Sequence, residues 1–234
     1  MPVIITSMTR LAIIALCSLA AAIPPAAAQS GWYGGISVGQ SRTSRDLVVN
    51  RESTITLGSD FDSDFDDKEG AFKGTLGYRL NRWIALEAGY ADLGSHRVLT
   101  RFPGGDPPLP AAIDLTREIT AAGADVVVFV PLGREAAVFA RLGLVRTRLK
   151  ARQALDGNVV FTGGDPSERV RSNVRNETTD HYGIGIEWAI DAQASMRLEW
   201  ERYAGIGKAF AIGGSGTTGE ADTDTLMVGV VLRF

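Results

Sequence analysis

The stretch that decides the fold is Leu226-Met227-Val228-Gly229-Val230-Val231-Leu232-Arg233-Phe234. Every even position in it is large and apolar, whereas the odd positions include a glycine and a charged arginine. A period of two residues is the pattern of a β-strand with two different faces. A soluble sandwich strand that ends in a free carboxylate seldom presents five bulky apolar groups on one side. Such a face is typical of a strand that meets lipid outside and a closed interior inside.

Seven earlier segments alternate in the same way, with bulky apolar residues at one parity and small or charged residues at the other. The eight segments cover residues 32–39, 72–80, 84–91, 122–130, 138–144, 181–190, 196–201 and 226–234. Eight is the smallest number of strands that closes a membrane barrel, and its narrow lumen is filled by side chains. The sequence therefore predicts an all-β fold, an eight-stranded antiparallel up-and-down transmembrane β-barrel.

The connections between these segments also alternate. Short turns are expected near residues 81–82, 132–134 and 191–193. Long polar stretches cover residues 43–69, 94–116, 149–178 and 205–223. Short periplasmic turns and long outer loops are the usual pattern of such barrels. We therefore expect both termini in the periplasm and four long extracellular loops.

The N-terminus has the features of an export signal. Arg10 is followed by an apolar core at residues 11–23, by two prolines and by three alanines at residues 26–28. The core is too short for a transmembrane helix, which needs about 20 residues. Cys17, the only cysteine, lies inside this segment and follows a leucine, so a lipoprotein signal is not expected. We expect residues 1–28 to be a cleaved signal peptide and residues 29–234 to be the barrel.

Composition excludes several classes of protein. The chain has 24 Lys and Arg against 27 Asp and Glu, and the signal peptide removes one basic residue and no acidic one. This mild acidity argues against a nucleic-acid-binding protein, which would carry a basic patch and a high pI. The mean hydropathy of +0.04 is too polar for a helical membrane protein. The mature chain has the length of one domain.

Three stretches carry a resemblance to a known family. Residues 70–94, GAFKGTLGYRLNRWIALEAGYADLG, look like the second hairpin of the outer-membrane-protein-A-like (OmpA/OmpX-type) barrels. Gly31-Trp32-Tyr33-Gly34-Gly35 resembles the first strand of that family, and Leu198-Glu199-Trp200-Glu201-Arg202-Tyr203 resembles its seventh. The resemblance implies the outer membrane of a Gram-negative bacterium. It also implies that the barrel-assembly machinery reads the last strand and the terminal Phe234.

The same resemblance limits what can be transferred. The type member of the family continues into a peptidoglycan-binding domain, whereas this sequence ends at Phe234. Peptidoglycan anchoring is therefore not carried over. The resemblance also raises one alternative, a gated pore like that proposed for the type member.

Charged residues occur at the parity assigned to the lumen. Buried charges must be paired, because an unpaired one costs several kcal/mol. We therefore expect a lumen charge network that plugs the barrel and fixes its shape, with a small porin-like diffusion pore as the alternative. The expected members are Lys73, Arg79, Glu87, Asp125, Arg141, Glu187, Arg197, Glu199, Glu201 and Arg233.

Catalytic and metal-binding motifs have little support. His96 and His181 are the only histidines, and neither lies in a His-x-Ser arrangement, so a lipid-A-modifying enzyme is the least favoured alternative. His181 is expected to be a hydrogen-bonded residue at the rim. The aspartates between residues 60 and 67 lack the glycine and glutamate of a calcium loop, which leaves at most weak binding of divalent ions. We expect no enzyme activity, catalytic residue, cofactor or structural metal.

A basic cluster follows the point at which the fifth strand should leave the hydrocarbon. Guanidinium groups suit phosphate geometry, so the cluster is a candidate for contact with lipopolysaccharide; the alternative is a solvated strand extension. Its members are Arg146, Arg148, Lys150 and Arg152. We expect a monomeric, structural surface barrel in outer-membrane lipid, whose loops contact lipopolysaccharide, host surfaces or envelope partners.

The sequence also makes one prediction of side-chain orientation and two of strand register. Shared parity places six apolar residues toward lipid, namely Leu86, Val128, Leu142, Ile186, Leu198 and Val230. The turn near Gly133 predicts that Val130 faces Ala136 and that Glu118 faces Arg148. The turn at residues 191–193 predicts that Glu187 faces Arg197 inside the lumen, because a slip by two would oppose Glu187 to another glutamate.

Overall fold

The computed structural model describes residues 30–43, 62–65, 68–102, 111–157, 165, 167–207 and 221–234. These residues form nine strands. The strands are β1 (Gly31–Thr43), β2 (Asp62–Phe65), β3 (Lys68–Arg79), β4 (Ile84–Phe102), β5 (Ala111–Pro131), β6 (Ala136–Gly157), β7 (Val170–Ala189), β8 (Ala194–Ile206) and β9 (Ala221–Arg233). No helix in this part of the chain is long and apolar enough to cross a membrane. The expected signal peptide lies outside the described residues.

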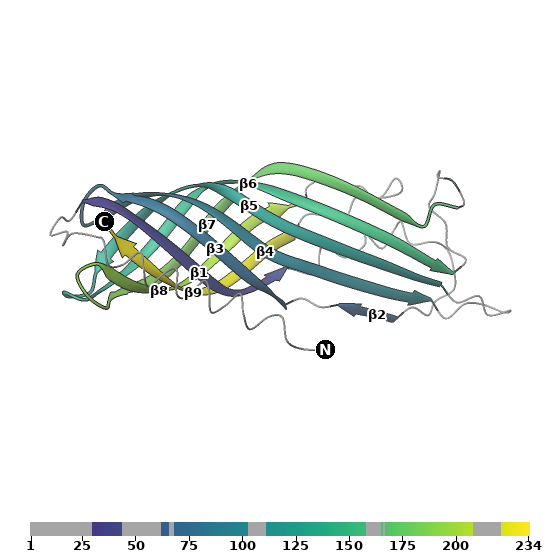
Figure 1. The fold of residues 1–234 in the computed structure, drawn as a ribbon, viewed down its shortest axis with the longest axis horizontal. Coiled ribbons are helices and arrows are strands. Elements are labelled where there is room, and N and C mark those ends of the chain that lie inside the picture. The colour runs from purple at the N-terminus through teal and green to yellow at the C-terminus, as the bar shows by residue number, and fades with distance from the viewer. Residues whose placement is uncertain are drawn as a thin grey trace.

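Eight of the strands close into a barrel. Each pairs with its sequence neighbour in antiparallel register, and β1 pairs with both β3 and β9, which closes the wall. Figure 1 shows the strands tilted around one long axis. The predicted eight-stranded up-and-down barrel is confirmed. The remaining strand, β2, was expected to be loop. It pairs with residues 98–101 in the extension of β4, beyond the residues of β4 that pair with β3.

The alternation of side chains agrees with the sequence in every barrel strand. Of the six residues expected to face lipid, Val230 is half-buried and the others are exposed, from 41% for Ile186 to 66% for Leu142. Their neighbours at the other parity, such as Glu187 and Arg141, are buried in the lumen. The inner face of the barrel therefore carries ionic and polar groups among aromatic side chains.

One predicted register is confirmed and one is wrong. Glu187 lies opposite Arg197 between β7 and β8. Between β5 and β6, however, Val130 lies opposite Val138, and Glu118 lies opposite Lys150 instead of Arg148. The amide of Leu132 donates to the carbonyl of Ala136, so the turn spans residues 133–135 and is centred one residue later than expected. This shift moves the register by two residues and leaves every side chain on its predicted face.

The strands are unequal in length. β4, β5, β6 and β7 have 19 to 22 residues, whereas β1, β3, β8 and β9 have 12 or 13. A transmembrane strand needs about 9–11 residues, so the longer four continue beyond the membrane, at the end away from the C-terminus (Figure 1). Much of the polar sequence at 94–116 and 149–178, expected to be loop, therefore forms strand. Outside the membrane these strands no longer need an apolar outer face.

Candidate functional site in the barrel lumen

The ten charged residues predicted for the lumen all lie on inner faces of the barrel strands. Arg79 and Arg233 are partly exposed at the periplasmic mouth, and the other eight are buried. Each points inward because it shares the parity of small or aromatic residues, while its neighbours in sequence face lipid. The five cations and five carboxylates contact one another in one continuous network.

Arg141 on β6 lies at the centre of this network. Its Nη2 is 2.8 Å from Glu199 Oε2 and 3.1 Å from Glu87 Oε2. Its Nη1 is 2.9 Å from Glu201 Oε1 and 3.7 Å from Asp125 Oδ2. One guanidinium thus contacts carboxylates from β4, β5 and β8, which lie on different sides of the barrel wall.

Arg197 on β8 is the second centre. Its Nε is 2.7 Å from Glu187 Oε2, and its Nη1 is 2.6 Å from Glu87 Oε1. Glu87 therefore bridges Arg141 and Arg197. The Tyr33 hydroxyl also donates to Glu87 Oε1 at 2.7 Å, so each oxygen of this buried carboxylate has a cationic partner and one has a hydroxyl donor as well.

Lys73 on β3 contacts the two glutamates of β8 in this network. Its Nζ lies 2.5 Å from Glu199 Oε1 and 2.5 Å from Glu201 Oε1. The Ser37 hydroxyl donates to Glu199 Oε1 at 3.0 Å. Lys73 and Arg141 together neutralise the two glutamates of β8, which would otherwise be like charges on one inner face.

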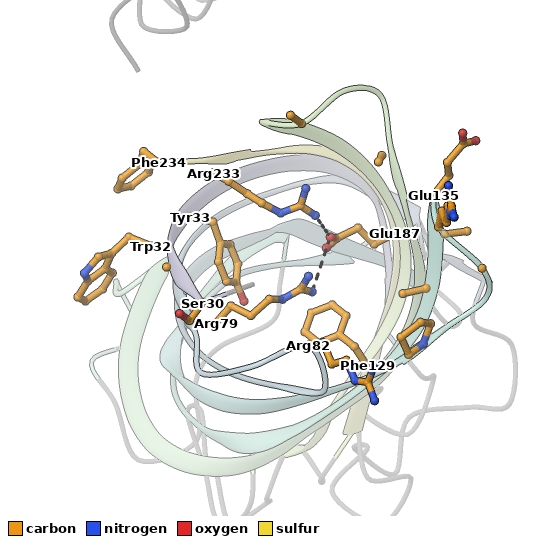
Figure 2. A pocket seen from close by; sticks show the side chains of 18 residues that line it. Ser30, Trp32, Tyr33, Arg79, Arg82, Phe129, Glu135, Glu187, Arg233 and Phe234 are labelled. Atoms are coloured by element: carbon orange, nitrogen blue, oxygen red, sulfur yellow. Dashed lines mark hydrogen bonds and ion pairs between the residues drawn. The ribbon is translucent and has the colours of Figure 1, made fainter. Parts of the chain in front are cut away.

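The periplasmic end of the network borders an open cavity of about 500 Å³. Figure 2 shows Arg79 and Arg233 converging on Glu187 at this mouth, beside Tyr33. Arg233 Nη2 donates to Glu187 Oε1, and Arg79 Nη2 lies 3.7 Å from the same oxygen. The Arg79 guanidinium also lies over the ring of Phe129, 3.8 Å from its centroid. The cavity is bounded on its inner side by charged groups that belong to the network.

His181 was expected at the rim, and that placement is wrong. It is buried in the middle of β7, because this strand begins at Val170, well before the segment predicted from the sequence. Its Nδ1 is 2.8 Å from Asp125 Oδ1, and its ring stacks on Tyr203 at 4.4 Å. Its Nε2 is 3.6 Å from Glu201 Oε2.

These contacts orient the imidazole of His181, and none of them comes from a nucleophilic side chain. In the described part of the chain its ionic contacts are both carboxylates, whereas hydrolytic chemistry would need a Ser, Thr or Cys beside the ring. Among the same residues no group of three or more potential ligands could hold a metal ion. The aspartates that resembled a calcium loop, Asp60, Asp62, Asp64, Asp66 and Asp67, lie outside the described side chains.

The predicted basic cluster forms a row on the outer face of β6. Arg146, Arg148, Lys150 and Arg152 are all exposed, and the row follows directly after the exposed Leu142 and Leu144. Lys150 Nζ is 3.1 Å from Glu118 Oε2 on β5. Within the described residues no carboxylate pairs with Arg146 or Arg148. We call these four residues the basic row.

Several members of the lumen network were missed from the sequence. Tyr33, Ser37, His181 and Tyr203 all donate to or contact its carboxylates. Where these residues lie in a strand segment predicted from the sequence, their inward orientation followed from the alternation. Their partners were not, because they lie on strands far apart in the chain.

Comparison with known proteins gives a family match and a set of solved structures. Residues 12–234 match the model of the outer membrane protein beta-barrel domain. The chain is similar to Neisserial surface protein A, with 13% identity and a TM-score of 0.49 over 88% of this chain and 99% of that one. It is also similar to Ail, the attachment invasion locus protein of Yersinia pestis, with 16% identity and a TM-score of 0.43 over 87% and 99%. For OprG from Pseudomonas aeruginosa the identity is 13% and the TM-score 0.45, over 88% and 97%. No curated protein matches the chain.

Proposed function

The chain belongs to the outer membrane protein beta-barrel domain family, and we propose that it is a structural surface protein whose lumen is closed by ion pairs and whose basic row contacts lipopolysaccharide. The barrel resides in the outer membrane of a Gram-negative bacterium. Its termini face the periplasm, and its long connections face the exterior. The contact of Arg141 with carboxylates on different sides of the wall is the observation that best supports a closed lumen.

Opening a path for ions would require breaking several of these contacts together. Arg141 and Arg197 each bridge carboxylates of non-neighbouring strands, and Phe129 and Phe139 pack beside the arginines. Removing one partner of a buried ion pair costs about 3–5 kcal/mol, because the other charge stays unpaired in a poorly solvated interior. The closed arrangement therefore supports a structural plug over a diffusion pore.

The position and charge of the basic row support contact with lipid phosphates. The row begins one strand step beyond Leu144, where the lipid-facing side chains end. Alternate residues of a strand lie about 6.6 Å apart, so Arg146 and Arg148 are the two members nearest the hydrocarbon. Among the described residues, Lys150 is the one member of the row with a carboxylate ion pair. A planar guanidinium can bind a phosphate through two parallel hydrogen bonds.

The test of this contact compares two variants in nanodiscs. Arg146→Gln/Arg148→Gln should lower the affinity for lipopolysaccharide by about fivefold per arginine, since each basic residue near an anionic surface contributes about 1 kcal/mol. Lys150→Gln is the matched comparison and should lower the affinity less than either arginine does, because Glu118 already pairs with that lysine. Equal affinities for all three proteins, or an undiminished affinity for lipopolysaccharide stripped of phosphate, would refute the contact.

Two other functions make different predictions. A diffusion pore predicts steady conductance of the refolded barrel in a planar bilayer. A lipid-A-modifying enzyme predicts a changed lipid A mass after expression. A structural barrel predicts neither result, so these two measurements separate the proposal from its alternatives.

A further inference from the structure

One buried arginine among the described residues lies in the outer lumen, away from the charge network. Arg117 on β5 is 3% exposed, and it shares the inward parity of Leu115 and Ile119. It is eight residues from Asp125 on the same strand, which corresponds to about 26 Å along the backbone. Arg117 is therefore too far from the network to be neutralised by it.

The walls around Arg117 are mainly apolar. Leu115 and Ile119 flank it on β5, and Ala151 lies directly opposite on β6. On the β4 side its partner in register is His96, which is also buried. The side chains of directly opposed residues lie about 5 Å apart, so the imidazole of His96 is the polar neighbour that the register gives to the guanidinium.

Carboxylates close to Arg117 in sequence point away from it. Asp114 and Glu118 have the opposite parity and lie on the outer face of β5. Asp114 forms a two-point contact with Arg97, and Glu118 pairs with Lys150. The network carboxylates are matched one for one by their own cations. Among the described residues, Arg117 is thus a buried cation with no counter-charge.

Two nitrogen atoms of the Arg117 guanidinium form a pair of hydrogen-bond donors. Its Nε and Nη2 are buried and have no hydrogen-bond partner. These two groups make up the side of the guanidinium that binds a carboxylate or phosphate through two parallel bonds. A buried charge left in this state costs several kcal/mol, and a bound anion would remove that cost.

We propose that Arg117, with His96 beside it, forms a binding site for a small oxyanion in the outer lumen. The ligand is a phosphate, a sulfate or a carboxylate group that reaches the site from the outer side of the membrane. Two sources share this chemistry: a free anion of the medium, and a phosphate group of lipopolysaccharide. The site is distinct from the basic row, which lies on the outer face of the wall.

The experiment measures thermal unfolding of the refolded barrel in phospholipid nanodiscs during titration with inorganic phosphate. The wild-type midpoint should rise and saturate, and Arg117→Gln should abolish the saturable rise. Arg117→Lys keeps the charge but loses the paired donors, so half-maximal stabilisation should need about tenfold more phosphate. Arg97→Gln is the matched control, because Arg97 lies at nearly the same height on the outer face and is not part of the basic row; it should respond as the wild type does.

A second arm identifies the source of the anion. In nanodiscs that contain lipopolysaccharide, a lipid phosphate as ligand would raise the wild-type midpoint without added phosphate and leave Arg117→Gln unchanged. A free anion as ligand would leave the phosphate titration the same with and without lipopolysaccharide.

Two results would overturn the proposal. An equal, unsaturable rise in every variant would be the general effect of an excluded salt on burial. If Arg117→Gln instead destabilises the barrel in anion-free buffer and the wild type gives no phosphate response, the counter-charge of Arg117 belongs to the chain itself.

Discussion

Arg197 on β8 and Glu87 on β4 meet across the lumen, with 2.6 Å between Nη1 and Oε1, although 110 positions separate them in the sequence. Their strands are not neighbours in the sheet. The contact therefore joins two sides of the barrel wall that no backbone hydrogen bond connects. Glu187 binds the same guanidinium through Nε, so Arg197 holds together three strands.

Loss of Arg197 should be far more destabilising than loss of an exposed cation. Arg197→Ala leaves Glu87 and Glu187 short of a partner in a poorly solvated interior, and should lower the free energy of unfolding by about 3–5 kcal/mol. A double-mutant cycle with Glu187→Ala should show clear coupling. The same cycle on the exposed pair Glu118 and Lys150 is the control and should give about 1 kcal/mol or less. Additive effects of Glu187 and Arg197 would contradict the ion pair.

The lipid-facing register predicts where a charge can be tolerated. Val126 on β5 lies between the exposed Leu86 and Leu142, near the middle of the apolar face. Val126→Arg should destabilise the barrel by about 2–4 kcal/mol in lipid vesicles. Val130→Arg, on the same face but next to the periplasmic end of the strand, should cost about 1 kcal/mol or less. Equal costs measured by denaturant unfolding would mean that the membrane band is misplaced.

Gly77 on β3 is required because the ring of Tyr33 lies against it. A Cβ at this position would lie 2.2 Å from Tyr33 Cζ. Gly77→Ala should therefore push the ring away from its hydrogen bond with Glu87 and lower stability by about 1–3 kcal/mol. Gly74→Ala is the control, since a Cβ there meets nothing within 4 Å. A neutral Gly77→Ala would show that the Tyr33 ring is not fixed at this place.

The turn between β7 and β8 should lose stability at acidic pH. Asp191 Oδ1 accepts hydrogen bonds from the amides of Gln193 and Ala194, at 2.7 Å each. These bonds hold the pKa of the Asp191 carboxyl below its usual value of 3.8. Because the folded-state pKa is depressed, the stabilisation is complete above the ordinary carboxyl pKa and is lost as the pH falls through the lowered pKa.

Nuclear magnetic resonance of the Gln193 and Ala194 amides tests this behaviour. Their shifts should titrate with a midpoint below 3.8 in the wild type, and Asp191→Asn should abolish the titration while keeping the acceptor. Asn81 already makes the equivalent bonds to Trp83 and Ile84 in the turn between β3 and β4, so the amides of that turn are an internal control. A midpoint at or above 3.8 would be inconsistent with the turn geometry.

Much of the barrel could be predicted from the sequence because a period of two assigns every side chain to a face. The parity of Leu226 to Phe234 and of the seven other segments was sufficient to predict which residues face lipid. Registers are harder, since they depend on the length of each turn. Glu187 and Arg197 were paired correctly because like charges excluded the alternative, whereas the apolar pairs around Val130 fit either register and gave no such constraint.

The partners inside the lumen could not be predicted in the same way. Inward parity identifies Glu87 and Arg141 as lumen residues, but the curvature and stagger of the closed wall decide which side chains meet. The outer strand extensions were taken for loops because they carry polar residues on their outer face, as expected once a strand has left the membrane. Arg117 lies between the stretch 94–116 and the strand segment predicted to begin at residue 122, so its burial was not visible in the sequence.

Single-channel recording of the refolded barrel in a planar bilayer tests the closed lumen most directly. The wild-type barrel should give no steady ionic current, because Arg141 and Arg197 join opposite parts of the wall through Glu87, Glu199 and Glu201. Arg141→Ser should produce openings, and Lys150→Gln on the outer face should not. A sustained wild-type conductance that Arg141→Ser leaves unchanged would contradict the closed lumen.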